Sequence, residues 1–130
     1  MMYLIDSDTA IYLIRNNPKV VRKFMEIRVS DWVVSAITAF EIEKGIEFQA
    51  HGDAASRARE FLDLAEVESV THRVAQRAAV IHNQLRKAGR PIGLADELIA
   101  AHALEMNLTL VTNNTRHFEN VSGLKLENWL

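Results

Sequence analysis

The 130-residue sequence contains no cysteine. Disulfide bonds and thiolate metal sites are therefore excluded, and any bound metal must be held by oxygen atoms or imidazole nitrogens. Hard cations such as Mg²⁺ prefer oxygen ligands. Proline is also scarce, with two residues, and there are no repeats or low-complexity tracts that would mark a linker. We therefore expect one domain over residues 1–130.

Long hydrophobic runs are absent as well. The apolar segments are short and broken by charges, and none approaches the ~18 consecutive apolar residues that span a bilayer. The first five residues carry no positive leader, and Asp6 interrupts them too early for a signal peptide. We expect a cytoplasmic protein that does not enter a membrane.

The sequence has no overall excess of positive charge, since its formal net charge is -2. Most tight electrostatic nucleic-acid binders are basic. The charges are unevenly spread, however: residues 31–68 hold nine acids and three basic residues, whereas residues 69–95 hold five basic residues and no acid. The basic segment can contact phosphates locally, or it can be a solvated helix with cations near its C-terminal end. Both interpretations stay open.

Short apolar runs alternate along the chain with segments of helical character. Such alternation predicts an α/β domain with a mainly parallel sheet, in which strands are buried on both faces. Strands are expected at 3–5, 32–34, 67–70, 108–112 and 124–126. Helices are expected from an N-cap at Asp8 to Arg15, from Pro18, and at 35–49, 53–65, 71–88 and 94–107.

Four polar residues fall where such a fold forms its ligand crevice, outside the carboxyl ends of the strands. Asp6 ends the first predicted strand, and Asn114 follows the strand at 108–112. Glu41 and Asp96 lie in the first turns of two helices, whose N-termini meet the same edge because crossover helices run antiparallel to the strands. Four separate segments are thus predicted to bring polar side chains together.

The helical phase of the two acids points to burial. Glu41 lies inside the arc of its helix that is bounded by Ile37, Phe48 and Ile42. Asp96 shares a face with Ile99 and Ala103. Buried carboxylates are costly unless they are paired or bind a metal, and several together repel each other. A divalent cation held by Asp6, Glu41 and Asp96 would resolve both problems.

Each of these residues also has an ordinary structural explanation. Asp6 can cap the following helix, Asp96 can favour a helix N-terminus, and the phase assigned to Glu41 can be slightly wrong. Their convergence on one edge favours the metal site. The histidines have no metal-ligand spacing, so we expect surface or packing roles for His51, His72, His82, His102 and His117. Likewise, Trp32 and Trp129 are expected to be core or interface anchors.

Four segments resemble the motifs of PIN-domain ribonucleases, in particular the VapC toxins of type II toxin–antitoxin pairs. Residues 3–8 (YLIDSD) resemble the Y-L-L-D-T-N opening of the family, and residues 35–41 (SAITAFE) resemble the segment with its second acid. Residues 91–103 (PIGLADELIAAHA) resemble the third-acid motif, and residues 110–118 (LVTNNTRHF) match the fourth segment. The similarity covers essentially the whole chain, in the expected order.

The resemblance implies a three-layer α/β/α sandwich and Mg²⁺-dependent (Mn²⁺ as the alternative) endoribonuclease activity. Carried over by position, the metal-site acids are Asp6, Glu41 and Asp96. It further implies neutralisation by a cognate VapB-like antitoxin, a homodimer, and contact with DNA only through the antitoxin. Relatives with this Thr-Asn-Asn ending include enzymes that cut tRNA in the anticodon region, including initiator tRNA, so tRNA is the leading substrate hypothesis.

The sequence departs from the family pattern at two positions. Many PIN domains have an Asp where this chain has Asn114, and Asp8 stands where Asn is common. Either three acids suffice or Glu119 completes the site, while Asn114 either positions water and RNA or closes a turn. The Thr112 hydroxyl either contacts the site or is simply a hydrogen-bonded hydroxyl at the end of a strand.

A phosphoacceptor receiver domain fits poorly, because the acidic pair after its first strand is missing. The alternative function is a catalytically weak PIN-like module that binds a partner or DNA.

Overall fold

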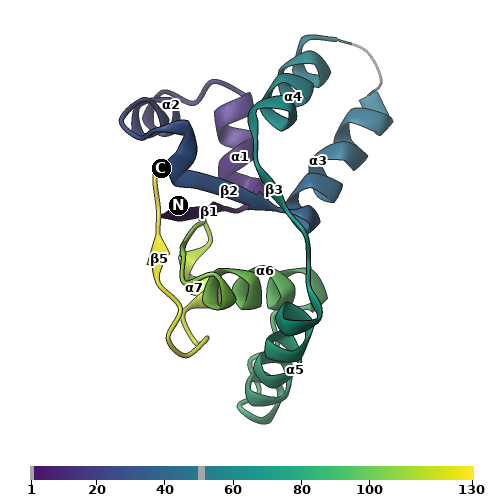
Figure 1. The fold of residues 1–130 in the computed structure, drawn as a ribbon, viewed down its shortest axis with the longest axis vertical. Helices are drawn as coiled ribbons and strands as arrows, with labels where there is room; N and C mark the ends of the chain where they lie inside the picture. Colours follow the sequence, from purple (N-terminus) through teal and green to yellow (C-terminus); the bar gives the residue numbers. More distant parts are fainter. Residues whose placement is uncertain (1, 50–51) are drawn as a thin grey trace.

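The computed structural model describes residues 2–49 and 52–130 (Figure 1). The chain alternates between strands and helices, as the sequence predicts. The strands are β1 (Tyr3–Ile5), β2 (Trp32–Ser35), β3 (Val67–Glu68), β4 (Thr109–Val111) and β5 (Leu126–Glu127). The helices are α1 (Ser7–Ile14), α2 (Pro18–Met25), α3 (Ala36–Gln49), α4 (Asp53–Leu64), α5 (His72–Lys87), α6 (Leu94–Glu105) and α7 (Thr115–Phe118), with a 3₁₀ turn at Val29–Asp31.

The five strands form one sheet in the order β3-β2-β1-β4-β5, and every described pairing is parallel. Helices α1 to α4 cover one face of the sheet and α5 to α7 cover the other (Figure 1). The predicted three-layer α/β/α architecture is therefore confirmed. In the described residues, no helix is both long enough and apolar enough to cross a bilayer.

The central strands are buried on both faces. Successive side chains of a strand point to opposite faces, so each strand supplies both cores. Leu4 packs into the core beneath α5 and α6, and its neighbour Ile5 packs into the core beneath α1 to α4; neither has any exposed surface. This double burial explains why the strands are apolar runs rather than alternating sequences.

Aromatic residues fill the core on the α1–α4 side. The Trp32 ring stacks on Phe61 at 5.4 Å between centroids and makes an edge contact with Phe24 at 5.0 Å. Trp129 packs edge-on against Phe24 and Tyr3. Both tryptophans are buried, which confirms that they are core anchors.

The start of α1 differs from the sequence prediction. The N-cap is Asp6, whose carboxylate accepts a hydrogen bond from the Ser7 N–H at 2.8 Å, and Asp8 lies inside the first turn. Asp8 was the wrong choice because its carboxylate accepts instead from the N–H groups of Thr9 and Asn113. One helix start thus places two carboxylates beside the end of β1.

Several element ends are shorter than predicted. Helix α6 ends at Glu105 rather than 107, because Asn107 adopts a positive φ of 55°, a left-handed conformation that terminates helices. The ladders of β3, β4 and β5 cover two or three residues each, although the Thr112 N–H still donates to the Glu127 carbonyl just beyond β4. The final strand pairs at Leu126–Glu127 rather than 124–126.

Candidate active site

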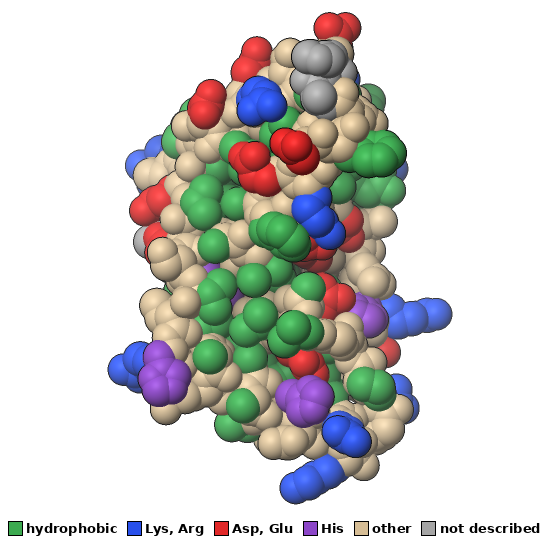
Figure 2. Space-filling model, turned by 90° about the vertical axis from the view of Figure 1, so that its right-hand side faces the viewer, with side chains coloured by type: hydrophobic (Ala, Val, Ile, Leu, Met, Phe, Trp, Pro, Cys, Tyr) green, Lys and Arg blue, Asp and Glu red, His purple; other side chains and the backbone are tan. Residues whose placement is uncertain are grey.

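The carboxyl ends of β1 and β4 meet at Asp6 and Thr112. These strands are neighbours in register, with Ile5 opposite Val111, so the residue after each strand lies at the same edge. The Thr112 hydroxyl donates to Asp6 Oδ2 at 3.0 Å, and both side chains are buried. The Thr112 hydroxyl therefore has a defined contact with the candidate acid, as the sequence suggested. Figure 2 views the side of the molecule toward which β1 and β2 run, where acidic side chains lie among hydrophobic ones.

Asp8 belongs to the same cluster, which the sequence interpretation missed. Its Oδ2 accepts from the Asn113 N–H at 3.1 Å and lies 3.3 Å from the Thr112 hydroxyl. The two contacts tie the first turn of α1 to the end of β4. The Asp-x-Asp spacing at a strand end was the available signal, but we had assigned Asp8 only to helix capping.

Three carboxylates influence one another electrostatically at this edge. Burial raises the pKa of Asp6 to about 7, the charges of Asp8 and Asp96 push it in the same direction, and hydrogen bonds from Ser7 and Thr112 oppose them. Burial also raises the pKa of Asp96. The neighbouring His117 opposes this shift, whereas the charge of Asp8 adds to it. Asp6, Asp8 and Asp96 thus form an anionic centre at this edge. Two of its members, Asp6 and Asp96, are among the three acids predicted from the sequence.

His117 has a defined place in this centre. Its Nε2 lies 2.8 Å from Asp96 Oδ2 and 3.1 Å from the Ile92 carbonyl oxygen, so the N–H can serve both acceptors. The sequence interpretation gave His117 only a surface or packing role, and this was wrong. A search for metal-ligand spacing does not detect a histidine that orients a carboxylate through a hydrogen bond.

The other histidines mostly keep the roles expected for them. His72 is exposed, His82 bonds Glu97 at 2.7 Å between Nδ1 and Oε2, and His102 is buried in contact with Ser35. His51 lies outside the described residues.

Glu41 stands apart from the three aspartates. It is half-buried and lines a groove formed by α1, α3 and α4, and its charge is not among the causes that shift the pKa of Asp6 or Asp96. The prediction that Phe48 lies on the buried side of α3 is wrong, because its side chain is 90% exposed. Helix α3 does bury Ile42, which bounds the predicted arc, together with Ile46, against α1 and α4.

Asn114 and Glu119 flank the centre without joining it directly. The Asn114 N–H donates to the Thr112 hydroxyl oxygen at 3.1 Å, and its φ of −102° is not left-handed. A left-handed turn role is therefore ruled out for Asn114. Glu119 is exposed at the end of α7, and no hydrogen bond or ion pair among residues 2–49 and 52–130 links it to Asp6, Asp8 or Asp96.

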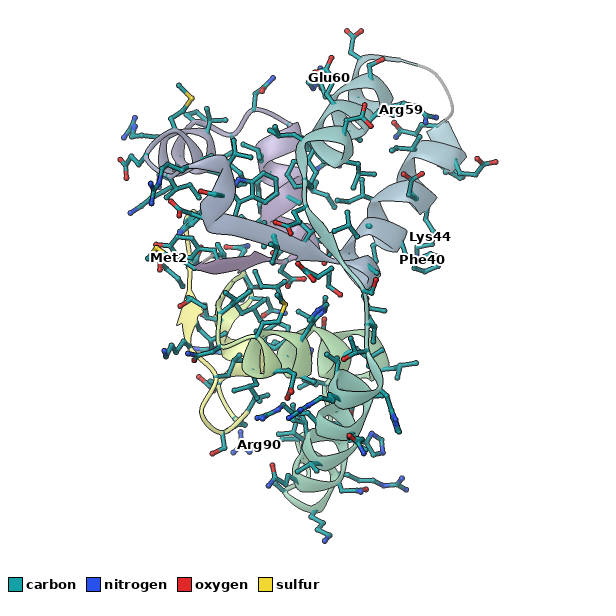
Figure 3. The ribbon with its side chains drawn as sticks, in the orientation of Figure 1. Met2, Phe40, Lys44, Arg59, Glu60 and Arg90 are labelled. Atoms are coloured by element: carbon teal, nitrogen blue, oxygen red, sulfur yellow. The ribbon has the colours of Figure 1, made fainter. Side chains whose placement is uncertain are left out.

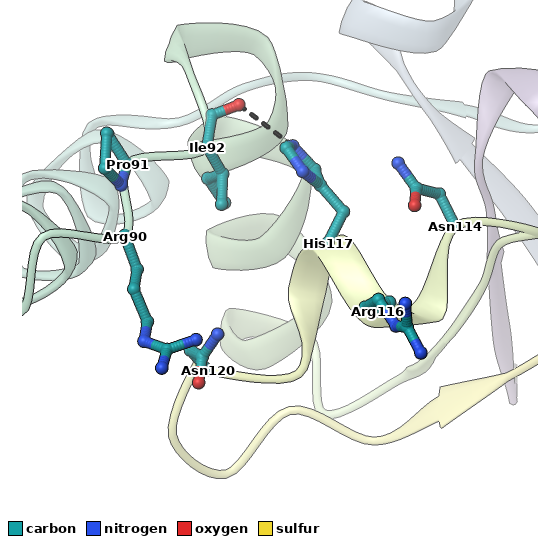
Figure 4. A pocket seen from close by; sticks show the side chains of 7 residues that line it. All are labelled: Arg90, Pro91, Ile92, Asn114, Arg116, His117 and Asn120. Carbon is teal, nitrogen blue, oxygen red and sulfur yellow. Dashed lines mark hydrogen bonds between the residues drawn. The ribbon is translucent and has the colours of Figure 1, made fainter.

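A pocket of about 320 Å³ opens beside the acidic centre (Figure 4). One wall is the segment before α6, and the other is α7 with its flanking residues. The pocket is lined by Arg90, Pro91, Ile92, Asn114, Arg116, His117 and Asn120. We refer to it as the basic pocket. His117 lies between it and Asp96, so the basic pocket and the acidic centre are adjacent.

The donor set suits a hard divalent cation. It consists of carboxylate oxygens, with no thiolate, and the elevated pKa of Asp6 reflects a burial and repulsion that a cation would relieve. In their present positions, no three acidic or histidine side chains of the described residues are grouped closely enough to enclose a metal ion. Coordination of a cation by three of these side chains would therefore require side-chain movement, which need not include Asp96, already held by His117.

Comparisons with known proteins identify the family of the chain. The PIN-domain family model matches residues 3–124. The chain is 31% identical to the tRNA(fMet)-specific endonuclease VapC of Salmonella typhimurium, over 99% of this chain and 98% of that protein. It is 33% identical to ribonuclease VapC1 of Haemophilus influenzae strain R2866, with the same coverage.

The fold comparison reaches the same family. The chain matches the crystal structure of DNA-bound VapBC from Salmonella typhimurium with a TM-score of 0.87 and 30% identity, covering all of this chain and 99% of the other. The family model, the full-length relatives and the fold therefore all point to the same family. The chain belongs to the PIN-domain family and, within it, to the group of VapC-like proteins.

Proposed function

We propose that this protein is a metal-dependent endoribonuclease toxin that cleaves RNA and is neutralised by a cognate VapB-like antitoxin. The observation that carries the proposal is the cluster of Asp6, Asp8 and Asp96 at the carboxyl edge of the sheet. Relatives along the whole chain are named ribonucleases, which supports the same chemistry. The protein acts in the cytoplasm, where its RNA substrate is found.

The cofactor in this proposal is Mg²⁺, with Mn²⁺ as the alternative. Asp6 and Asp96 would be its principal ligands, and Asp8, which shares the Thr112 hydroxyl with Asp6, would lie beside them. Glu41, the third predicted acid, would have to reach the cation from α3. When bound, such a cation activates a water and stabilises the negative charge on the transferred phosphate.

The chain's own residues prepare this site. The Thr112 hydroxyl and the Ser7 N–H hold the two oxygens of Asp6, so the carboxylate has a fixed orientation. The His117 N–H holds Asp96 in the same way. Asn114, a neutral amide, can accept from a water and donate to a phosphate oxygen. Its role in the proposal is to position water or RNA.

The proposed substrate is tRNA, with initiator tRNA cut in the anticodon region as the specific hypothesis. The name of the Salmonella relative, a tRNA(fMet)-specific endonuclease, supports this choice. The proposed assembly is a homodimer bound by antitoxin, with DNA contacted only through the antitoxin. The similar fold of DNA-bound VapBC from Salmonella typhimurium supports the antitoxin partner. The acidic centre, when it holds no metal, would also attract an arginine of the antitoxin, because a guanidinium group can bridge two carboxylates.

The central test is cleavage of total tRNA during titration with Mg²⁺. Wild-type protein should cleave as Mg²⁺ is added and stop when EDTA is added, whereas Asp96→Asn should not cleave. Glu43→Gln, an exposed change on α3, is the matched control and should cleave like wild type. Equal cleavage by wild type and Asp96→Asn would overturn the assignment.

A second experiment tests the toxin role. Expression of this chain alone should arrest growth, and co-expression of the neighbouring reading frame should restore it. Harmless expression counts against the toxin role. The alternative is a catalytically weak PIN-like module that binds a partner or DNA, and it is favoured by Asn114, a neutral residue where many PIN domains have an Asp. In that case tRNA stays intact at every Mg²⁺ concentration.

A further inference from the structure

The basic pocket differs from the acidic centre in the sign of its charge. Two arginines, Arg90 and Arg116, line it together with the amides of Asn114 and Asn120, and no acidic side chain lines it. The two walls come from segments that are distant in sequence, and Figure 4 shows the Arg90 side chain extending from its wall toward Asn120. The pocket therefore offers several hydrogen-bond donors within one concave surface.

The two pocket arginines are free of acidic partners in the described part of the chain. Neither Arg90 nor Arg116 forms an ion pair there, and both are exposed. Arg73 and Arg77, from the same basic stretch of sequence as Arg90, both pair with Glu105 at 2.9 Å. The basic stretch is thus divided: Arg73 and Arg77 share one carboxylate, whereas Arg90, like Arg86 and Lys87, forms no ion pair with the described residues and is available to a ligand.

The chemistry of the lining favours phosphate over nucleobases. Guanidinium groups bind phosphate oxygens through two parallel N–H donors, and amides add further donors. The pocket contains no Phe, Tyr or Trp ring on which a base could stack. Contacts of this kind position a nucleic acid without reading its sequence.

The position of the pocket connects it to the acidic centre. His117 lines the pocket, and its Nε2 is 2.8 Å from Asp96 Oδ2. Asn114 also lines the pocket and bonds through its N–H to Thr112, which holds Asp6. A backbone phosphate in the pocket would therefore lie beside the carboxylates, which by themselves repel RNA.

We propose that the basic pocket, through Arg90 and Arg116, binds a backbone phosphate of RNA next to the one that is cleaved. This inference rests on the proposed ribonuclease function and adds to it a defined contact for the substrate backbone. The pocket supplies the attraction that the acidic centre lacks, and it holds the strand in place across the Asp6–Asp96 edge.

The test measures binding of a single-stranded 12-nucleotide RNA in EDTA, so that cleavage does not interfere. Arg90→Gln and Arg116→Gln, alone and together, should weaken binding, by on the order of tenfold for the double variant at 50 mM salt. Each lost phosphate contact should reduce the slope of log K against log salt by about 0.7. Arg59→Gln is the control, because Arg59 is exposed on α4 at the opposite end of the molecule from Arg90 (Figure 3).

The outcomes separate this proposal from the proposed function. If wild type binds RNA and both pocket variants bind less tightly with reduced salt slopes, the pocket assignment is supported, even where Mg²⁺ produces no cleavage and the nuclease proposal fails. If cleavage occurs, the pocket variants should raise KM with kcat nearly unchanged. Unchanged affinity and salt slope in the double variant, or no RNA binding by wild type, would overturn the pocket assignment.

Discussion

His102 on α6 and Ser35 at the end of β2 form a buried hydrogen bond, with 2.9 Å between Nδ1 and Oγ. The Ser35 oxygen also accepts from the Ile37 N–H at 3.1 Å in the first turn of α3. Burial lowers the pKa of His102 and so favours the neutral imidazole, whose tautomer decides whether Nδ1 donates to the Ser35 hydroxyl or accepts from it. The pair fastens α6, which carries Asp96, to the start of α3, which carries Glu41.

Replacement of Ser35 by alanine should destabilise the protein. The change leaves the His102 Nδ1 buried without its partner, since His102 is only 2% exposed. An unsatisfied buried polar group costs about 1–3 kcal/mol, and the free energy of unfolding in urea should fall by that amount. Ser122→Ala, at an exposed loop position, is the control. Equal unfolding free energies for wild type and Ser35→Ala would contradict the role of the pair.

The same pair predicts a pH dependence of stability. Burial lowers the pKa of His102, so the unfolded chain binds a proton at this site more readily than the folded protein does. The contribution of His102 is therefore fully present above the unfolded pKa of about 6.5 and is lost as the pH falls through the folded pKa. Urea unfolding between pH 7.5 and 5 should show a smaller loss in His102→Gln than in wild type. Parallel profiles for the two proteins would refute this assignment.

Asp6→Asn should stabilise the metal-free protein at pH 8 and abolish its stabilisation by Mg²⁺. Burial and the neighbouring charges raise the Asp6 pKa to about 7. Holding this carboxylate ionised in the fold at pH 8 consequently costs on the order of 4 kcal/mol, since each pKa unit above the ordinary value of 3.8 corresponds to about 1.4 kcal/mol. Thermal melts in EDTA and in Mg²⁺ test both parts. A lower melting temperature in EDTA, or an undiminished Mg²⁺ shift, would contradict the proposed cation site.

Two substitutions at Asn114 should separate positioning from metal binding. Asn114→Ala removes the amide and should reduce the cleavage rate about tenfold or more with nearly unchanged Mg²⁺ affinity, by analogy with the loss of a positioned hydrogen-bond donor. Asn114→Asp adds a charge beside the cluster and should tighten Mg²⁺ binding. Cleavage at the wild-type rate by Asn114→Ala would restrict Asn114 to the structural contact with Thr112.

One buried hydroxyl should be dispensable for stability. Thr38 Oγ1, on α3, is completely buried and has no hydrogen-bond partner among the described residues. Valine has nearly the same shape without the hydroxyl, so Thr38→Val should raise the free energy of unfolding by about 1 kcal/mol. Urea denaturation measures the change, and Thr71→Val, which removes the N-cap of α5, should instead lower stability. Destabilisation by Thr38→Val would show that the hydroxyl has a structural role.

The sequence predicted the sheet well because its strands are short apolar runs that only a doubly covered parallel sheet can bury. It also placed Asp6 and Asp96 correctly at one edge, since strand ends and helix N-termini converge there by topology alone. The phase of Glu41 was less predictable. Which side of α3 is buried depends on its packing against α4, and that packing leaves Phe48 in solvent.

Local patterns gave little indication of the roles of Asp8 and His117. The Asp-x-Asp spacing places Asp8 near the strand end but fits a capping residue equally well, and its contact with Asn113 joins positions 105 residues apart. His117 is recognisable only through its distance to Asp96, which depends on how α7 lies against the start of α6. Local sequence rules describe caps and periodicity, whereas these roles arise from long-range packing.

The hydrogen bond between Thr112 and Asp6 spans 106 positions of a 130-residue chain. Strand β1 reaches its partner β4 only after most of the polypeptide has been synthesised, so a nascent or truncated chain that ends before Thr112 lacks one wall of the acidic centre. The parallel pairing of β1 with β4 likewise requires the C-terminal part of the chain. The order of the strands thus delays assembly of this edge until synthesis of the chain is nearly complete.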